Sequence, residues 1–203
     1  MKKYAVLHEP GDIVTLAGTR FVVLDVERCG SLPDSLFLLA LESVGASEFG
    51  SSNNYAESDL KKAVDKWLED MGKRGLDNAK LIPREIDLTT LDGSGCYGKL
   101  SVKAAPLTLD EAREYADIIP NAERWCWLAT GWSGPSKSDG DYALNVNSSG
   151  DRDNYGCSSS NGIRPALKIP SDLLLDSADK PDLSEVPTDT LLEEIRRRVV
   201  DKA

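Results

Sequence analysis

The pattern of apolar and polar positions predicts a β-hairpin and a buried strand near the start of the chain. Residues 13–16 and 21–26 are rich in apolar and β-branched side chains and are separated by a turn at residues 17–19, which is typical of a hairpin. The run LFLLAL at residues 36–41 is wholly apolar. A run of this length, bounded by Pro33 and Gly45, favours a buried strand.

Two helices are predicted from helical spacing and from capping residues. The first is expected to begin at Ser58 or Asp59 and to end near Gly72 and Gly75, because these residue types favour helix starts and stops respectively. Its apolar face is formed by side chains three or four positions apart, namely Leu60, Ala63, Val64, Trp67, Leu68 and Met71. The second begins at the capping box Thr108-x-x-Glu111 and ends before Pro120.

The remaining pattern indicates short strands joined by irregular segments. Strands are predicted at residues 125–130, 142–146 and 163–169, and a shorter one within residues 81–88. The Gly-rich residues 89–101 are expected to be irregular. Two short helices among unevenly spaced strands, without a repeating strand–helix–strand order, indicate an α+β domain with mostly antiparallel strands.

Composition changes after Pro170 and divides the chain into three predicted parts. Residues 1–170 are expected to form one domain, because a chain of 203 residues suits a single core with an appendage. Residues 171–187 mix acids with prolines and are interpreted as a linker or surface arm, and residues 188–203 as a C-terminal amphipathic helix. The apolar stripe of that helix needs a partner, so we expect it to serve docking or homo-oligomerisation.

A polar run lies between two apolar segments. From Asn145 to Gly162, fourteen of eighteen residues are Asn, Ser, Asp or Gly, a composition typical of disordered linkers. The run nevertheless joins two predicted strands of one domain, and it holds no nucleophile–base pair. We interpret it as a binding surface of short, adaptable side chains on a rigid scaffold, as in antibody paratopes.

Charge and cysteine usage argue against several classes of function. The chain has 24 Lys and Arg against 34 Asp and Glu, a net charge of −10, which disfavours nucleic acid and anionic membranes as partners because both require a basic face. The four cysteines form no CxxC pair, so structural zinc is not expected, while a disulfide stays open. With no signal-peptide core and no apolar run long enough for a membrane span, we expect a cytoplasmic or virion-associated protein.

Candidate catalytic and metal-binding residues are few. His8 is the only histidine and is interpreted as a surface residue. Asp151 and Asp153 fit two positions of a calcium loop whose remaining ligands are missing, so we predict no metal ion, no cofactor and no catalytic residue. Arg164, in the apolar GIRPAL segment, is interpreted as a buried structural cation held by a carboxylate or by backbone carbonyls.

The tryptophans carry further information. Trp125 and Trp127 alternate with Cys126 and are expected to share one face of a strand, whereas Trp132 follows a glycine in a loop. Core packing is the ordinary interpretation for one of the two faces of this strand, and Trp132 suits either a structural role or a binding surface.

Seven segments occur in an order that resembles an uncharacterised domain family of gut-type bacteria and their phages. They are GDIVTLAGTRFVVLDV, LFLLAL, VDKWLEDM, PLTLDEAREY, RWCWLATG, ALNVNSSG and NGIRPALKI, and they cover roughly residues 10–170. Family members show a W-W-L-R-[ST]-P/G segment, an A-x-x-V-x-x-x-G strand and turn, and a closing G-[VIF]-R-P-A-L motif. Here Ala129 and Gly131 stand where the family has Arg and Pro.

The resemblance implies a C-type-lectin-like fold, of the variant shared with formylglycine-generating enzymes and with the variable proteins of diversity-generating retroelements. In those variable proteins, adenine-directed mutagenesis rewrites Asn-type codons before a closing G-[FVI]-R motif. Between Ser133 and Asn161, the residues of the kind that this process produces are Asp141, Asn145, Asn147, Asp151, Asp153, Asn154, Tyr155, Ser158 and Ser160. The calcium and sugar signatures of true lectins are absent, so calcium-dependent sugar binding is not implied.

We therefore predict a non-enzymatic, phage- or prophage-associated recognition domain that binds a protein or cell-surface ligand through a diversifiable loop surface. The expected contact residues are Trp132, Ser133, Ser136, Asp141, Asn145, Asn147, Asp151, Arg152, Asp153, Asn154, Tyr155, Ser158, Ser160 and Asn161. Two alternatives stay open. One is an oxidoreductase of the formylglycine-generating type, with Cys126 and Cys157 binding copper, and the other is a structural component of a phage particle.

Overall fold

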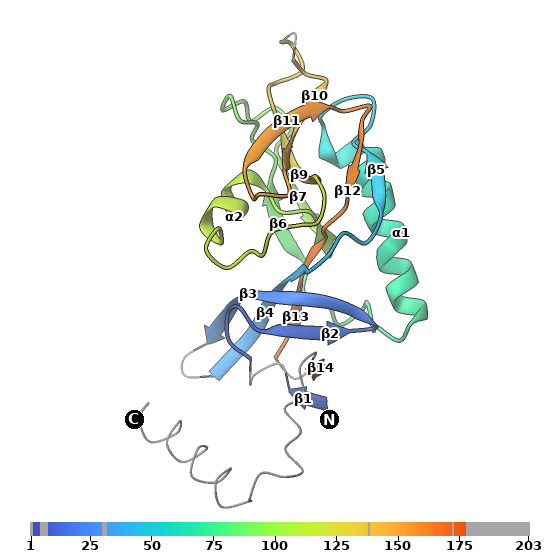
Figure 1. Ribbon diagram of the computed structural model, residues 1–203, viewed down its shortest axis with the longest axis vertical. Coiled ribbons are helices and arrows are strands. Elements are labelled where there is room, and N and C mark those ends of the chain that lie inside the picture. Colours follow the sequence, from blue (N-terminus) through green and yellow to red (C-terminus); the bar gives the residue numbers. More distant parts are fainter. Residues whose placement is uncertain (1, 5–7, 30–31, 138, 172, 178–203) are drawn as a thin grey trace, which may run out of the picture.

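A computed structural model describes residues 2–4, 8–29, 32–137, 139–171 and 173–177 (Figure 1). The predicted helix at residues 188–203 and most of the predicted arm at residues 171–187 lie outside these ranges. Within them the chain is α+β, as expected, with mostly antiparallel strands in several sheets and two α-helices.

The largest sheet of the described chain has seven strands in the order β1-β14-β2-β3-β4-β13-β8, and each neighbouring pair is antiparallel. Their bounds are β1 Lys2–Tyr4, β2 Ile13–Leu16, β3 Thr19–Cys29, β4 Leu32–Ala40, β8 Ala104–Ala105, β13 Ala166–Pro170 and β14 Leu174–Ser177. β14 falls in the segment that we expected to be a linker or surface arm. Its pairing with β1 and β2 makes this part of the arm a member of the main sheet.

β2 and β3 confirm the predicted hairpin. Ala17 and Gly18 connect the two strands, and both have positive φ, at 48° and 76°. Two successive residues of positive φ form the turn whose twist matches that of the flanking strands.

The second sheet lies above the first in Figure 1 and has the order β11-β10-β9-β12-β5 among the described strands. Its strands are β5 Ala46–Glu48, β9 Cys126–Gly131, β10 Tyr142–Val146, β11 Arg152–Gly156 and β12 Ser160–Gly162. A further antiparallel pair joins β6 (Arg84–Asp87) to β7 (Lys99–Val102). β6 confirms the short strand expected in LIPREIDL, and β7 begins at the end of the segment expected to be irregular.

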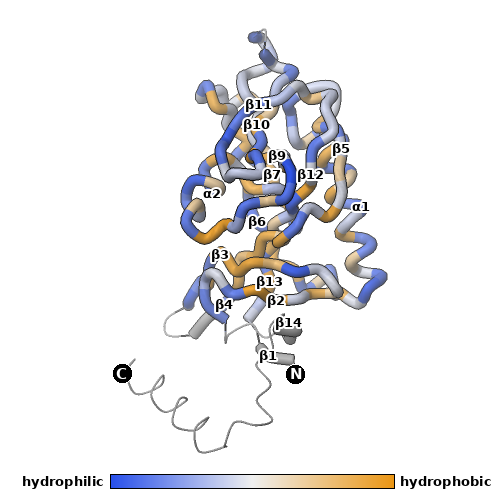
Figure 2. The backbone as a smooth tube through the Cα atoms, in the orientation of Figure 1, coloured by the Kyte–Doolittle hydropathy of each residue, from blue (hydrophilic) through white to orange (hydrophobic). Residues whose placement is uncertain are grey.

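Two helices cover opposite faces of β3 and β4. Phe21 and Val23 point to the side covered by α1 (Asp59–Lys73), whereas Val22 and Leu24 point to the side covered by α2 (Leu109–Glu114). Because both faces are buried, these strands read as continuous apolar runs rather than as alternating ones. In Figure 2, hydrophobic residues gather on β3 and β13, whereas β11 is mostly hydrophilic.

The caps of both helices follow the sequence signals. Ser58 is the N-cap of α1, and its Oγ accepts from the backbone N–H of Lys61. Thr108 and Glu111 form the predicted capping box of α2. Gly72 was expected to end α1, but it lies inside the helix, which ends at Lys73 before Gly75 adopts a φ of +103°.

Two further expectations are corrected. The strand predicted at residues 163–169 begins only at Ala166, because Ile163 bonds instead to the backbone of Val44 and Gly45 in an irregular link. His8, expected at the surface, is buried, and its Nδ1 lies 3.2 Å from Oδ2 of Asp12.

Candidate ligand-binding site

The polar run between β10 and β13 is ordered and contains two short strands, β11 and β12, that the sequence did not predict. β10 and β11 form a hairpin in which Leu144 faces Asn154 and Asn145 faces Asp153. The connecting turn is closed by Asn147, whose Oδ1 accepts from the backbone N–H groups of Ser149 and Asp151 at 2.8 and 3.0 Å. A side-chain bond of this kind replaces a backbone turn bond and fixes the register of the hairpin.

The run is fastened to the core at two further points. Cys157 is buried, and its backbone carbonyl accepts from the N–H groups of Phe49 and Gly50 at 2.9 and 3.1 Å. Gly162, at the end of β12, is packed so tightly that an added Cβ would lie 2.8 Å from Sγ of Cys126 and from Oγ of Ser43. The polar run therefore follows a fixed path through the domain, although most of its residues are small and polar.

The predicted contact residues divide into three groups by exposure. Exposed residues are Ser136, Asp141, Asp151, Arg152, Asp153, Tyr155, Ser158 and Ser160. Half-buried residues are Trp132, Asn147, Asn154 and Asn161. Ser133 and Asn145 are buried.

The prediction that Ser133 and Asn145 contact a ligand is therefore wrong, because buried side chains cannot contribute to an exposed surface. Asn145 lies in the middle of β10, in register with Trp127 of β9 on one side and Asp153 of β11 on the other. It is 0% exposed, and neither atom of its side-chain amide has a hydrogen-bond partner among the described residues. Trp132 packs partly against the core beside α2, which favours its structural interpretation.

An exposed aromatic pair lies on this surface, and sequence reasoning identified only half of it. The rings of Trp125 and Tyr155 are 5.9 Å apart and meet edge to face, with 38% and 49% of the two residues exposed. Trp127 is instead buried, with its Nε1 donating to the carbonyl of Ser47 at 2.9 Å. Tyr155 was among the predicted contact residues, whereas Trp125 was expected to share one strand face with Trp127. That expectation is wrong, because Trp125 lies one residue before β9 and is exposed while Trp127 is buried.

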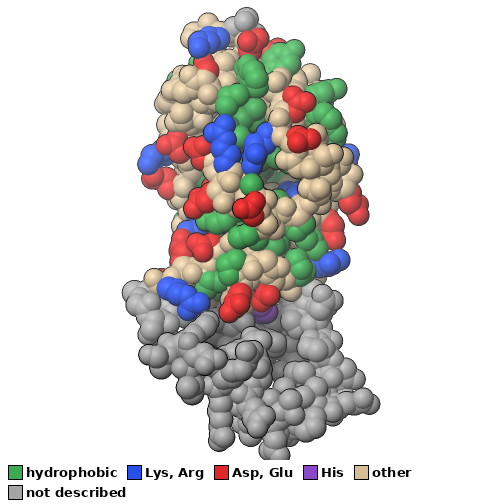
Figure 3. All heavy atoms as spheres, turned by 60° about the vertical axis from the view of Figure 1, so that its left-hand side comes forward, with side chains coloured by type: hydrophobic (Ala, Val, Ile, Leu, Met, Phe, Trp, Pro, Cys, Tyr) green, Lys and Arg blue, Asp and Glu red, His purple; other side chains and the backbone are tan. Residues whose placement is uncertain are grey.

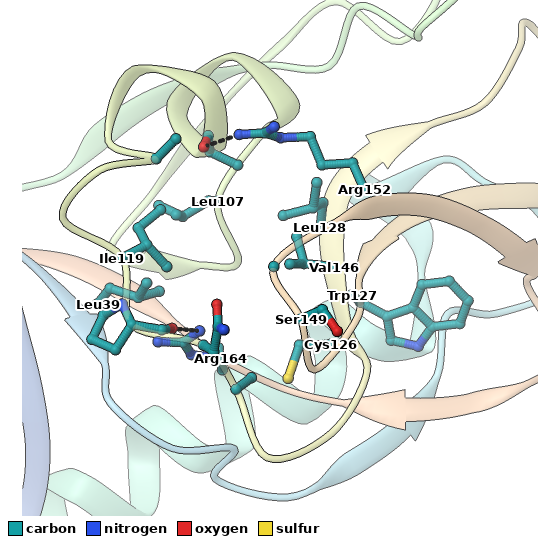
Figure 4. A pocket seen from close by; sticks show the side chains of 16 residues that line it. Leu39, Leu107, Ile119, Cys126, Trp127, Leu128, Val146, Ser149, Arg152 and Arg164 are labelled. Carbon is teal, nitrogen blue, oxygen red and sulfur yellow. Dashed lines mark hydrogen bonds between the residues drawn. The ribbon is translucent and has the colours of Figure 1, made fainter.

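A cavity of about 220 Å³ adjoins this surface between α2, β9 and the β10–β11 turn. Figure 4 shows Leu107, Ile119 and Leu39 on one side of it and Leu128 and Val146 on the other. The cavity wall includes the turn itself, where Gly150 has a φ of +88° and an added Cβ would lie 2.8 Å from Oδ1 of Asn121. Only glycine suits both the backbone conformation and the close contact at this position.

Two arginines lie at opposite ends of the cavity (Figure 4). Arg152 is exposed and donates from Nη2 to the carbonyl of Ala112 at 2.7 Å. Arg164 is 6% exposed and donates to the carbonyls of Ala40 and Pro120 at 3.0 and 3.1 Å. These two acceptors confirm the interpretation of Arg164 as a buried cation held by backbone carbonyls.

The cysteines of the second sheet are buried free thiols. Burial raises the pKa of Cys126 to about 11, against the opposing effect of Arg164 and Arg124, and raises that of Cys157 to about 12. Both are therefore thiols at neutral pH, whereas the thiolate is the form that binds metals. Among the described residues, no three His, Cys, Asp or Glu side chains are grouped as metal ligands would be.

The described helices include none with the length and apolar character needed to cross a membrane. Comparison of the chain with protein-family models, with curated proteins and with solved structures finds no match.

Proposed function

We propose that this protein is a recognition module that binds a protein or cell-surface ligand through the outward-facing side chains of residues 125–161. The observation that carries the proposal is the exposed Trp125–Tyr155 pair, in which Tyr155 of the ordered β10–β11 hairpin meets Trp125 just before β9. Aromatic side chains supply much of the binding energy of protein interfaces, and Ser, Asn and Gly around them supply adaptable hydrogen bonds.

The backbone supports such a surface because the hairpin ladder is made of main-chain bonds and not of bonds from the exposed side chains. β11 is an edge strand, and its ladder to β10 extends over five residue pairs, from Tyr142–Gly156 to Val146–Arg152. The bonds of this ladder join main-chain atoms, so an exchange of the exposed Asp153 or Tyr155 leaves them in place. The proposal includes a C-type-lectin-like fold and the diversification of these exposed positions.

The charged side chains around this surface indicate which kind of partner it would bind. Asp141, Asp151 and Asp153 are exposed and outnumber the one exposed cation of the hairpin, Arg152. An acidic rim favours a partner with a basic or hydroxyl-rich surface, and it makes association sensitive to salt.

Binding to bacterial surfaces tests the proposal. Purified protein carrying a fluorescent label is incubated with a panel of bacterial cell envelopes, and the retained fraction is compared for the native chain and for Trp125→Ala/Tyr155→Ala. The matched control is Leu91→Ala, which removes an apolar side chain of similar exposure, 40%, outside residues 125–161.

We expect the double variant to lose at least about tenfold in affinity, as loss of a central aromatic anchor does, while the control binds as the native chain. Retention of the double variant at the native level would overturn the proposal. The diversification part is tested separately by sequencing around the coding region. A neighbouring reverse transcriptase with a template repeat matching the codons for residues 125–167 is the expected result, and its absence removes that part.

A further inference from the structure

The cavity beneath the hairpin has the properties of a second binding site, which does not depend on the proposed surface. Of the sixteen described residues that line it, most are apolar, two are arginines and none is Asp or Glu. This composition is unusual in a chain whose net charge is −10. An apolar cavity with a few polar groups at defined places is the usual form of a small-molecule site.

Arg164 has hydrogen-bonding capacity that the protein does not use. Its Nε and Nη1 donate to backbone carbonyls, but its Nη2 is buried and has no acceptor among the described residues. Burial lowers the pKa of its guanidinium, yet an arginine remains charged at neutral pH. A buried guanidinium N–H without an acceptor is costly, and a carboxylate would satisfy it.

We propose that the cavity binds an amphipathic carboxylate, whose charged end pairs with Arg164 and whose apolar body lies between α2 and the strands β9 and β10. Leu107 and Ile119 would contact the body on the α2 side, and Leu128 and Val146 on the strand side.

The size of the cavity limits the ligand. A cavity of about 150 Å³ holds benzene, so 220 Å³ admits a body somewhat longer than one ring, such as a chain of about eight carbons. Entry is from the end at which Arg152 is exposed, because Arg164 at the other end is buried. Figure 3 shows this face of the molecule, with Lys and Arg side chains beside apolar ones near its middle.

Titration calorimetry with octanoate and with 1-octanol tests the proposal on the native chain. The two probes share an eight-carbon chain and differ in charge. We expect saturable octanoate binding with a Kd below about 1 mM and at least about tenfold weaker binding of octanol, because only the carboxylate satisfies Arg164. Equal or tighter binding of octanol, or no saturable binding of octanoate, overturns the proposal.

Variants locate the site. Ser149→Trp places a large side chain on a lining residue and is expected to weaken octanoate binding at least about tenfold. Its control is Ser148→Trp, which alters the neighbouring exposed residue outside the cavity lining and is expected to bind as the native chain. Equal behaviour of the two variants would place octanoate elsewhere and contradict the proposal.

Arg164→Gln tests the charged contact. We expect this variant to bind octanoate and octanol with similar affinity, since the cation is gone while the apolar walls remain. A preserved preference for octanoate would overturn the assignment to Arg164. Because Arg164 also holds two carbonyls, folding is checked by circular dichroism. If the variant does not fold, the proposal is tested by the comparison of octanoate with octanol on the native chain and by the two serine variants.

Discussion

The ion pair between Arg84 and Glu111 fastens α2 to β6 and sets the position of one wall of the cavity. Nη1 of Arg84 contacts the Glu111 carboxylate, and Nη2 donates to the carbonyls of Ala105 and Pro106, both at 3.0 Å. The guanidinium also lies over the ring of Phe37, 5.2 Å from its centroid. The side chains of Arg84 and Glu111 are 3% and 22% exposed, so the pair is largely removed from solvent.

Arg84→Met is expected to destabilise the fold by about 3 kcal/mol. Breaking a buried ion pair by removing one partner costs about 3–5 kcal/mol, and the lower end applies because Glu111 keeps partial contact with water and its bond from the N–H of Thr108. Glu111→Leu leaves the more deeply buried Arg84 as an uncompensated cation, so we expect a loss of about 4 kcal/mol.

The double variant distinguishes an ion pair from two independent contributions. Arg84→Met/Glu111→Leu removes both charges, and the remaining cost is that of two carbonyls and one helix cap at about 1 kcal/mol each, or about 3 kcal/mol in all. The loss in the double variant should therefore be well below the sum of the two single losses, which is about 7 kcal/mol. Urea unfolding followed by tryptophan fluorescence measures all three free energies. A double variant whose loss equals the sum of the single losses would refute the coupling.

Three smaller changes test other contacts. Gly162→Ala forces a Cβ to within 2.8 Å of two side-chain atoms and is expected to cost about 1–3 kcal/mol in urea unfolding, whereas Gly45→Ala, with open space around it, should change stability by less than about 0.5 kcal/mol. Asn145→Leu replaces a buried amide that has no hydrogen-bond partner in the described part of the chain by an apolar group of similar size, so the urea midpoint should rise. A clear fall in the midpoint would show that the amide is satisfied. With its pKa raised to about 11, Cys126 is about 0.1% thiolate at pH 8, so mass spectrometry should find iodoacetamide on the exposed Cys96 first. Because burial raises the pKa of Cys126, the contribution of this thiol to stability is present below its ordinary pKa of about 9 and is lost as the pH rises toward 11. Labelling of native Cys126 at pH 8 as fast as that of Cys96 would contradict its burial.

Strong local patterns made much of the framework predictable. The hairpin of β2 and β3, the apolar strand β4, the helix α1 and the capping box at Thr108 all depend on residues close together in the chain. In each case burial or a cap selects the residue type at a fixed spacing. These elements can therefore be predicted from the sequence alone.

β11 and β12 could not be predicted in this way. β12 pairs with β5 more than one hundred residues earlier, and its contact with β9 is a single position, Gly162 beside Cys126. Main-chain hydrogen bonds of this kind select no side chain, and small polar residues are depleted in strands generally. Composition therefore identified the residues of the proposed binding surface, but it did not predict the strands that arrange them.

The cavity was missed for a different reason. Arg164 was recognised as a buried cation, but the residues that surround it come from α2, β9 and the β10–β11 turn. Most of these residues are apolar for the ordinary reason of core packing, and Ser149 and Gly150 belong to a polar turn. Only their arrangement in space shows that they leave a space open beside an arginine with an unused donor.

The pairing of β14 with β1 and β2 has a practical consequence for anyone who expresses part of this chain. A fragment ending at Pro170, where composition changes, would lack β14, which lies between β1 and β2 in the sheet. Among the described strands β1 would lose the one it pairs with, and β2 would present a row of unpaired main-chain groups to solvent. Such an open edge is a template for pairing with other chains, so the shortened protein is expected to aggregate even though its core is intact.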